Sequence, residues 1–235
     1  MFSYTFDWAV ITTGRYAEWL FEGIKVTIQL SLVSIVLAFL LGLLIAVMRM
    51  STVKPVRWFA HGYLEFFRNT PLLVQIFFWY FGSYQVLPRA VNDWLTGMNF
   101  EFAAAVISLT IYTSAFIAED IRSGVRSIPK EQMEAARSSG FSYIGSMRHI
   151  ILPQAVRITI PPLISQFLNL VKNSSLAMTI GVAELTYQAR QVESYTFKGF
   201  EAFTAATLVY LVMSVAITGL VTLYSMKVLN PIRTH

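Results

Sequence analysis

Long apolar stretches alternate with shorter polar ones along this chain, which is the pattern of a protein that crosses a lipid bilayer several times. The uncharged stretch Val26–Met48 has 23 residues. As a helix it is about 35 Å long, and a hydrocarbon core of about 30 Å needs about 20 residues. Four more stretches suit the same role: Asn69–Pro88, Phe102–Ala118, Ile158–Val171 extended back through Ile150, and Ala202–Met226. We predict an all-α integral membrane protein with five transmembrane helices.

Composition supports the membrane assignment and excludes several kinds of chemistry. Hydrophobic residues make up 55% of the chain and charged residues 13%, against about 25% charged in a typical soluble domain. The absence of cysteine excludes disulfides and thiolate metal sites. The sequence contains neither a Walker-type phosphate-binding loop nor G-x-S-x-G, and its histidines are scattered. We therefore expect no catalytic residue, no metal site and no cofactor in this chain.

The first 25 residues are expected to stay on the mature protein outside the membrane. They lack the basic start and apolar run of a cleaved signal peptide. Their aromatic rings suit a segment at the lipid headgroup level, where one side of a ring is dry and the other wet. A plain flexible terminus is the alternative.

Lysine and arginine predict the orientation of the chain. Twelve of the 18 fall in the first and third loops between spans and in the C-terminal tail, and six fall on the other side. Because positive residues favour the cytoplasmic side, we expect the N-terminus outside and the C-terminus inside. Residues 26–226 would form the membrane domain and 227–235 a cytoplasmic tail. The net charge of +5 largely reflects this asymmetry, so nucleic-acid binding is not expected.

The third loop, residues 129–153, reads as helix, glycine break, helix. Pro129 fits the first turn of a short helix of about ten residues, and Gly140 suits its C-terminal end with a positive φ. Ser142 can cap a second helical run that Pro153 is expected to interrupt. Such a compact piece is suited to docking against another protein, although an ordinary surface hairpin shows some of the same features.

The spacing within this loop matches a known motif. It reads E-A-A, three residues, G, nine residues, I-x-L-P, and the matching residues are Glu134, Ala135, Ala136, Gly140, Ile150, Leu152 and Pro153. By these residues the chain resembles permease subunits of the type I ABC importers, whose EAA loop couples the membrane domain to an ATPase. The resemblance implies that the loop forms cytoplasmic coupling helices, and that an ATPase subunit grips it through Glu134 and its neighbours.

Three other segments look like the polar-amino-acid permeases of that superfamily. They are E-x-F-R-x-T-P at residues 65–71, the A-E-x-x-R-x-G run at residues 118–124, and L-V-K-N-S-S-L-A at residues 170–177. The last segment, with its lysine, is most similar to the glutamate/aspartate branch. Together with the EAA loop, the resemblance covers nearly all of residues 26–226.

Two pairs of charges near span ends are candidates for a structural network. Glu65 and Arg68 are one helical turn apart and are expected to pair at the inner interface. Glu119 and Arg122 also share a helix face, and we expect a network there that joins the third span to the motif loop. Direct contact of these side chains with substrate is the alternative.

The candidate substrate pathway centres on Lys172, at the outer end of the fourth span. A cationic, hydroxyl-rich break followed by a short apolar stretch is typical of a helix that stops inside a membrane protein and lines a cavity. Asn173, Ser174 and Gln75 are the other pathway candidates. The alternative is that Lys172 only extends its ammonium into the outer headgroups.

The resemblance implies a subunit of an importer in the bacterial inner membrane that carries polar amino acids, with glutamate and aspartate favoured. Expected partners are a second permease, identical or homologous, two ATPases that bind ATP and Mg²⁺, an extracytoplasmic solute-binding protein, and membrane lipids. Movement would follow alternating access, biased by nucleotide and by the loaded binding protein. Alternatives are a permease for glutamine, histidine or basic amino acids, an integral-membrane enzyme, or a passive channel.

Overall fold

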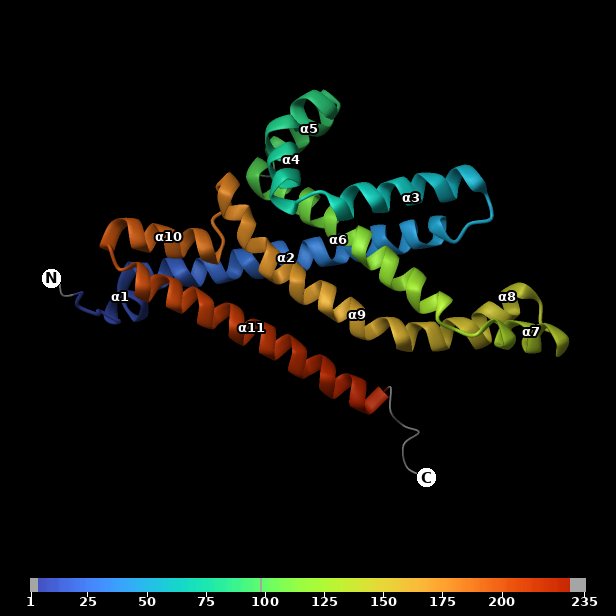
Figure 1. Cartoon of the computed structure of the whole chain (residues 1–235). Helices are drawn as coiled ribbons and strands as arrows, with labels where there is room; N and C mark the ends of the chain where they lie inside the picture. The colour runs from blue at the N-terminus through green and yellow to red at the C-terminus, as the bar shows by residue number, and fades with distance from the viewer. Residues whose placement is uncertain (1–3, 98, 229–235) are drawn as a thin grey trace. The chain divides into compact units, whose positions relative to one another are not determined.

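A computed structural model describes residues 4–97 and 99–228, and every regular element in that part of the chain is a helix (Figure 1). In chain order the elements are α1 (Ala9–Thr12), α2 (Gly14–Arg49), α3 (Lys54–Asn69), α4 (Leu72–Val86), α5 (Arg89–Gly97), α6 (Phe100–Arg126), α7 (Lys130–Ser138), α8 (Tyr143–Ser146), the π-helical segment η1 (Met147–Ile151), α9 (Leu152–Asn173), the 3₁₀ segment η2 (Ser174–Ile180), α10 (Leu185–Thr196) and α11 (Gly199–Val228).

All five apolar stretches lie largely in helices. Three helices in the described residues are long and apolar enough to cross a membrane: α2, α6, and α11 over Gly199–Val221. The predicted second span is a shorter apolar helix, Leu72–Ser83 within α4. The predicted fourth span is α9, which has 22 residues and contains Pro161 and Pro162.

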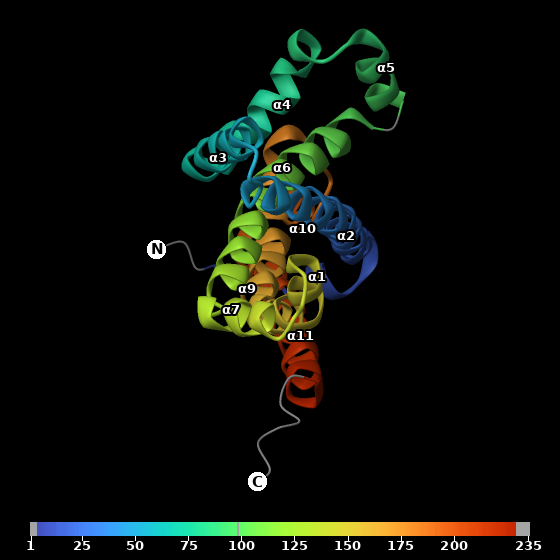
Figure 2. The ribbon, with the colours of Figure 1, turned by 90° about the vertical axis from the view of Figure 1, so that its right-hand side faces the viewer.

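Three of the connections predicted as loops contain helices. The stretch before the second span forms α3, because Pro55 lies in its first turn and the buried residues Ala60 and Leu64 are spaced to face one side of a helix. The other two helices are α5, which follows α4 after a turn (Figure 2), and α10. The tail prediction for residues 227–235 falls mostly outside the described residues.

The chain divides into two compact units. The first contains residues up to Ile35, Pro71–Leu109 and Leu168–Leu220, and the second contains Val36–Thr70, Thr110–Phe167 and the residues from Val221 onward. The motif loop lies in the second unit.

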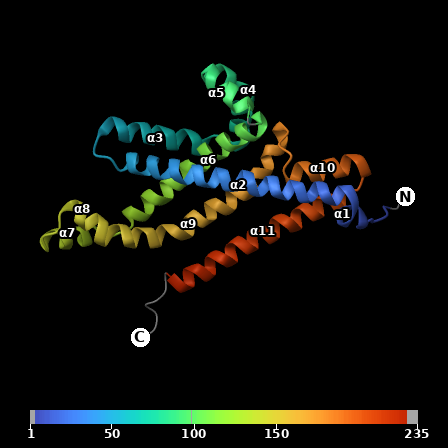
Figure 3. The same ribbon diagram turned by 180° about the vertical axis from the view of Figure 1, so that it is seen from behind.

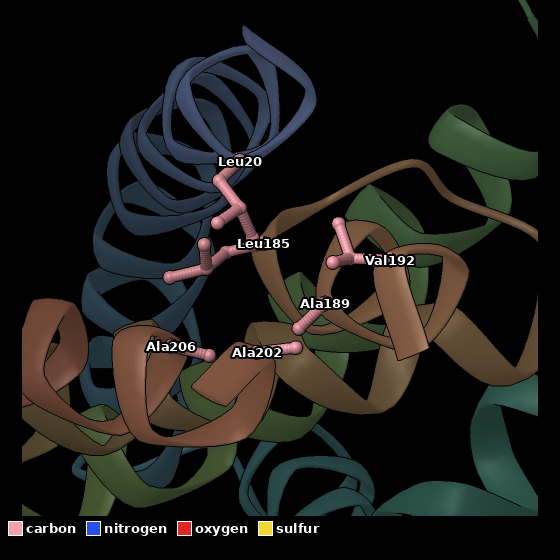
Figure 4. Packing of buried hydrophobic residues seen from close by; sticks show 6 residues of the cluster. All are labelled: Leu20, Leu185, Ala189, Val192, Ala202 and Ala206. Carbon is pink, nitrogen blue, oxygen red and sulfur yellow. The ribbon is translucent and has the colours of Figure 1, made fainter. Parts of the chain in front are cut away.

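In the first unit, α10 packs between the N-terminal half of α2 and the start of α11. Figure 4 shows the buried side chains that meet there, which are Leu20 of α2, Leu185, Ala189 and Val192 of α10, and Ala202 and Ala206 of α11. Gly23 makes the close approach possible, since a Cβ at that position would lie 2.8 Å from the Cα of Leu185.

A buried carboxylate fixes the start of α10. Glu184 is fully buried, and its side chain accepts hydrogen bonds from the backbone N–H of Thr186 (3.0 Å) and of Tyr187 (2.7 Å). The hydroxyl of Tyr210 on α11 donates a third, at 2.7 Å. These three donors replace the water that the carboxylate loses on burial.

The N-terminal segment is tied to the start of α11. The hydroxyl of Tyr4 donates to the Glu201 carboxylate, and the backbone N–H of Asp7 donates to the same group at 2.7 Å. The ammonium of Lys198 donates to the backbone carbonyl of Thr5. The bond to the Glu201 carboxylate raises the pKa of the Tyr4 hydroxyl. This segment therefore packs against the fold, in contrast to a flexible terminus.

In the second unit, α3 runs back alongside the C-terminal half of α2 (Figures 1 and 3). The buried core residues are Ile45 and Ala46 of α2, Ala60 and Leu64 of α3, and Ala115 and Ala118 of α6. The hydroxyl of Tyr63 donates to the carbonyl of Ile111 at 3.0 Å, and burial raises its pKa to about 12. It therefore stays protonated and holds α3 against α6.

Candidate functional site: the motif loop and a lysine-lined cavity

The first helix of the motif loop ends where the sequence predicts and begins one residue after Pro129, which the sequence pattern places in its first turn. Pro129 immediately precedes α7, and the helix ends at Ser138. Gly140 has φ +88°, the left-handed conformation that costs a residue with a Cβ about 1 kcal/mol or more. The predicted positive φ of Gly140 is thus confirmed.

The second helix of the loop begins at its predicted cap but does not stop at Pro153. Ser142 accepts a 3.1 Å hydrogen bond from the backbone N–H of Gly145, as a helix cap does. The helical path then continues through η1 into α9, so the expected interruption at Pro153 is wrong. The reason is local. Pro153 has no N–H to donate, and the wider π turn just before it lets the chain pass without that bond.

A small core makes the loop a rigid body. Ile128 before α7 packs with Ile151 and Ala155, and all three are buried. The amide of Gln154 donates a 2.6 Å hydrogen bond to the Oε1 atom of Gln132 on α7. Figures 1 and 2 show α7 beside the start of α9. A displacement of α7 is therefore passed to α9.

Most of the motif residues are available to a partner. Ala136 is buried and Ile150 is half-buried, so these two support the loop from inside. The exposed ones are Glu134, Ala135, Gly140, Leu152 and Pro153. The loop thus presents one acidic side chain together with small and apolar ones on a folded support.

The charged pairs near the span ends are arranged differently from one another. Arg122 donates through Nε to a Glu119 carboxylate oxygen at 2.8 Å, so these two side chains form an ion pair on α6. Glu65 and Arg68 form no ion pair in the described residues, and the expectation for them is wrong. Glu65 lies 3.8 Å from His61, and it also accepts a hydrogen bond from Asn69 at 3.2 Å.

Lys172 lines a cavity of about 370 Å³ between the end of α9 and α11. The residues around it are Leu168, Lys172, Ser214, Val215, Thr218 and Gly219. Ser214 and Thr218 come 12 and 16 residues after Ala202, or about 18 and 24 Å along the last span. Lys172 therefore lies beside the middle of that span, deeper than the outer end at which the sequence placed it.

The ammonium of Lys172 makes no ion pair or hydrogen bond within residues 4–97 and 99–228. Lys172 is exposed, so its ammonium is open to a ligand. Such a cation is suited to an anionic group that enters the cavity.

The other pathway candidates do not line this cavity. Asn173 is half-buried at the end of α9. Ser174 is fully buried, and its hydroxyl donates to the carbonyl of Val171 at 2.7 Å. Gln75 is buried within α4. Only Lys172 of the four is brought to the cavity.

The residues that sequence reasoning missed are the ones that join the loop's two helices: Ile128, Gln132, Ile151, Gln154 and Ala155. The i, i+4 spacing of Ile151 and Ala155 was the available signal for a buried face. Among the described residues no group of three or more histidine or acidic side chains could hold a metal ion.

Comparisons with known proteins match this architecture. Residues 38–230 match the family "Binding-protein-dependent transport system inner membrane component". The probable glutamine ABC transporter permease protein GlnM of Bacillus subtilis is 47% identical over 84% of this chain and 87% of its own length. The glutamate/aspartate import permease protein GltJ of Escherichia coli is 34% identical over 92% of this chain and 89% of its own length.

A solved structure shows the same fold. The crystal structure of an amino acid ABC transporter with histidines matches with a TM-score of 0.85 and 33% identity, over 96% of this chain and 100% of that one. The all-α fold is thus the permease fold of the type I ABC importers. Such permeases are transmembrane subunits without a catalytic site of their own. The chain belongs to the family of binding-protein-dependent transport system inner membrane components, as a permease subunit of an amino-acid ABC importer.

Proposed function

We propose that this chain is the membrane subunit of an ATP-driven importer for polar amino acids, and that glutamate and aspartate are its substrates. The observation that supports an acidic substrate is the cavity beside Lys172, whose ammonium has no anionic partner in the described residues. A substrate carboxylate would supply that partner and offset the cost of holding the charge at membrane depth.

Glutamine is the second candidate. It is favoured by the 47% identity to the probable glutamine permease GlnM. The α-carboxylate of glutamine could also pair with Lys172, so the two candidates differ in whether the side chain of the substrate carries a charge.

The proposed assembly has two permease subunits, two ATPase subunits that bind ATP and Mg²⁺, and an extracytoplasmic solute-binding protein, in the inner membrane of a bacterium. Closure of the ATPases on ATP would move the motif loops that they grip. Because α7 is joined to η1 and α9 through Gln132, Gln154 and the buried loop core, this movement would reach the spans. The pathway would then alternate between outward and inward openings.

The test is ATP hydrolysis by the complete complex reconstituted into lipid vesicles, with binding protein loaded with glutamate, aspartate or glutamine. We expect hydrolysis to rise severalfold with binding protein that carries the true substrate and to be accompanied by uptake of that substrate. If only glutamine stimulates hydrolysis, glutamine is the substrate and the proposal of an acidic substrate is wrong. If none of the amino acids stimulates hydrolysis, the proposal that the complex imports polar amino acids is wrong.

A further inference from the structure

The turn between α2 and α3, in the second unit, gathers positive charge. Arg49 ends α2, and Lys54 begins α3. Lys54, Arg57 and His61 follow one another at spacings of three and four residues, so they lie on one side of α3. Arg49 reaches this side from α2, because its Nη2 atom donates a hydrogen bond to the Nδ1 atom of His61 at 3.4 Å. Three cations and a histidine thus lie at this end of the α2–α3 hairpin.

Little negative charge balances these cations. No acidic residue occurs in the sequence between Glu22 and Glu65. Glu65 lies 3.8 Å from His61, but it is eight residues, or about 12 Å, along the helix from Arg57. Neither Lys54 nor Arg57 forms an ion pair within the described part of the chain. Their charges are therefore available to an anionic ligand.

The hairpin places the two cations at the depth of the lipid headgroups. α2 is one of the helices long and apolar enough to cross a membrane, and its uncharged stretch ends at Met48, one residue before Arg49. α3 runs back alongside the C-terminal half of α2 (Figures 1 and 3). Lys54 and Arg57 belong to the first turn of α3, so they lie near the level at which the uncharged stretch of α2 ends.

An exposed tryptophan accompanies the two cations. Trp58 follows Arg57 directly, lies one turn after Lys54, and is 70% exposed. Val47 in the last turn of α2 and Val53 just before α3 are exposed as well. An indole ring at headgroup level contacts acyl chains with its apolar face and donates a hydrogen bond through its N–H. A soluble anion would meet only the cations, whereas a phospholipid also covers the apolar side chains.

We propose that Lys54, Arg57 and Trp58 form a binding site for an anionic phospholipid, whose phosphate lies on the two cations and whose acyl chains lie along the apolar side chains of the hairpin. A guanidinium binds phosphate through two parallel hydrogen bonds, and an ammonium adds a point charge. A zwitterionic headgroup suits the site less, because its own cation is repelled by Lys54 and Arg57. Lipid binding at this turn does not involve the amino acid, so it goes beyond the proposed function.

The fluorescence of Trp58 gives a direct test. The permease–ATPase complex is placed in nanodiscs of phosphatidylcholine that contain increasing fractions of brominated phosphatidylglycerol or of brominated phosphatidylcholine. The signal of Trp58 is the difference between the unaltered complex and Trp58→Phe, and bromine on an acyl chain quenches tryptophans that touch that lipid. We expect phosphatidylglycerol to quench Trp58 by half at a mole fraction about fivefold lower than phosphatidylcholine, because the cations attract the anionic headgroup.

A double variant assigns this preference to the two cations. Lys54→Gln/Arg57→Gln should bring the two mole fractions to within about twofold, with Trp58 still quenched by both lipids. Lys25→Gln is the matched control, since it removes an exposed lysine of α2 on the other side of the uncharged stretch, and it should keep the fivefold preference. High salt should reduce the preference in the unaltered complex.

Equal quenching by the two lipids in the unaltered complex would overturn the proposal. A preference that survives in Lys54→Gln/Arg57→Gln, or that is lost to the same extent in Lys25→Gln, would overturn it as well. Quenching by neither lipid would mean that protein covers Trp58, and the proposal would be wrong. If Trp58→Phe does not assemble, Trp58→Tyr supplies the reference. If the double variant does not assemble, Lys54→Gln at its exposed position should lower the preference alone, and an unchanged preference would contradict the site.

Discussion

The side-chain amide of Gln154, near the start of α9, donates a 2.6 Å hydrogen bond to the Oε1 atom of Gln132 on α7. The same amide also donates to the carbonyl of Ile150 at 2.7 Å. Gln154 therefore holds the exposed helix of the motif loop to the helix that leads into the membrane domain. Neither glutamine belongs to the matched motif positions.

Loss of this contact should weaken coupling while leaving the fold intact. We expect Gln132→Leu to lower the substrate carried per ATP hydrolysed about two- to fivefold, because a hydrogen bond of about 1 kcal/mol is lost. Uptake and ATP hydrolysis are measured together in reconstituted vesicles. The Gln132→Leu/Gln154→Leu double variant should be little worse than Gln132→Leu. Additive losses would mean that the two residues act separately.

Gly23 should tolerate no side chain where α2 meets α10. A Cβ would lie 2.8 Å from the Cα of Leu185 and 2.9 Å from the Cγ of Gln188. We expect Gly23→Ala to destabilise the complex by about 1–3 kcal/mol, seen as a melting temperature lower by a few degrees.

Gly62 on α3 is the matched control for Gly23. A Cβ there meets nothing within 4 Å, so Gly62→Ala should leave the melting temperature unchanged or raise it slightly, since alanine favours a helix. Equal melting temperatures for the two variants would contradict the close approach of α2 and α10.

The orientation of the chain can be tested with single cysteines, because the protein has none of its own. We expect a cysteine at Asp93, in α5, to react with a membrane-impermeant thiol reagent in intact cells. A cysteine at Glu131, in the motif loop, should react only after the membrane is permeabilised. The opposite pattern would reverse the orientation inferred from lysine and arginine.

Lys172 should set the preference for acidic substrates. We predict that Lys172→Gln reduces uptake of glutamate or aspartate about tenfold or more, because one charge-assisted pair is worth about 1.4 kcal/mol or above. Affinity of the binding protein for its amino acid should not change. Lys25→Gln, which removes an exposed lysine paired with Glu22 at 2.6 Å, is the control. Uptake that stays near normal in Lys172→Gln would place selectivity elsewhere.

Much of the helical fold follows from the sequence, because long apolar stretches and helix caps are local signals. Pro129, Gly140 and Ser142 mark the helix ends of the motif loop, and the structure has the ends there. The part that could not be predicted depends on contacts between distant segments. Arg68 is within pairing distance of Glu65 by spacing alone, but the packing of α3 against α6 places its guanidinium over Phe116.

The structure also differs from the sequence prediction where a helix continues through a residue that usually ends one, or forms in a stretch rich in charge. The sequence predicts that Pro153 stops its helix, but the π turn of η1 removes the need for the missing hydrogen bond. The stretch between the first two spans carries four basic residues, so it reads as a loop. It forms α3 because Ala60 and Leu64 lie on one helix face and are buried in the core of the second unit.

The central claim is that the motif loop couples an ATPase to transport through Glu134, an exposed acidic residue on α7. The most direct measurement is the ratio of amino acid imported to ATP hydrolysed in vesicles that contain the complete complex, for Glu134→Ala against Glu131→Ala. Glu131 is exposed on the same helix and lies outside the motif. We predict that Glu134→Ala inserts normally and lowers both uptake and this ratio several-fold, while Glu131→Ala keeps both. Normal coupled uptake by Glu134→Ala at normal expression would contradict the claim.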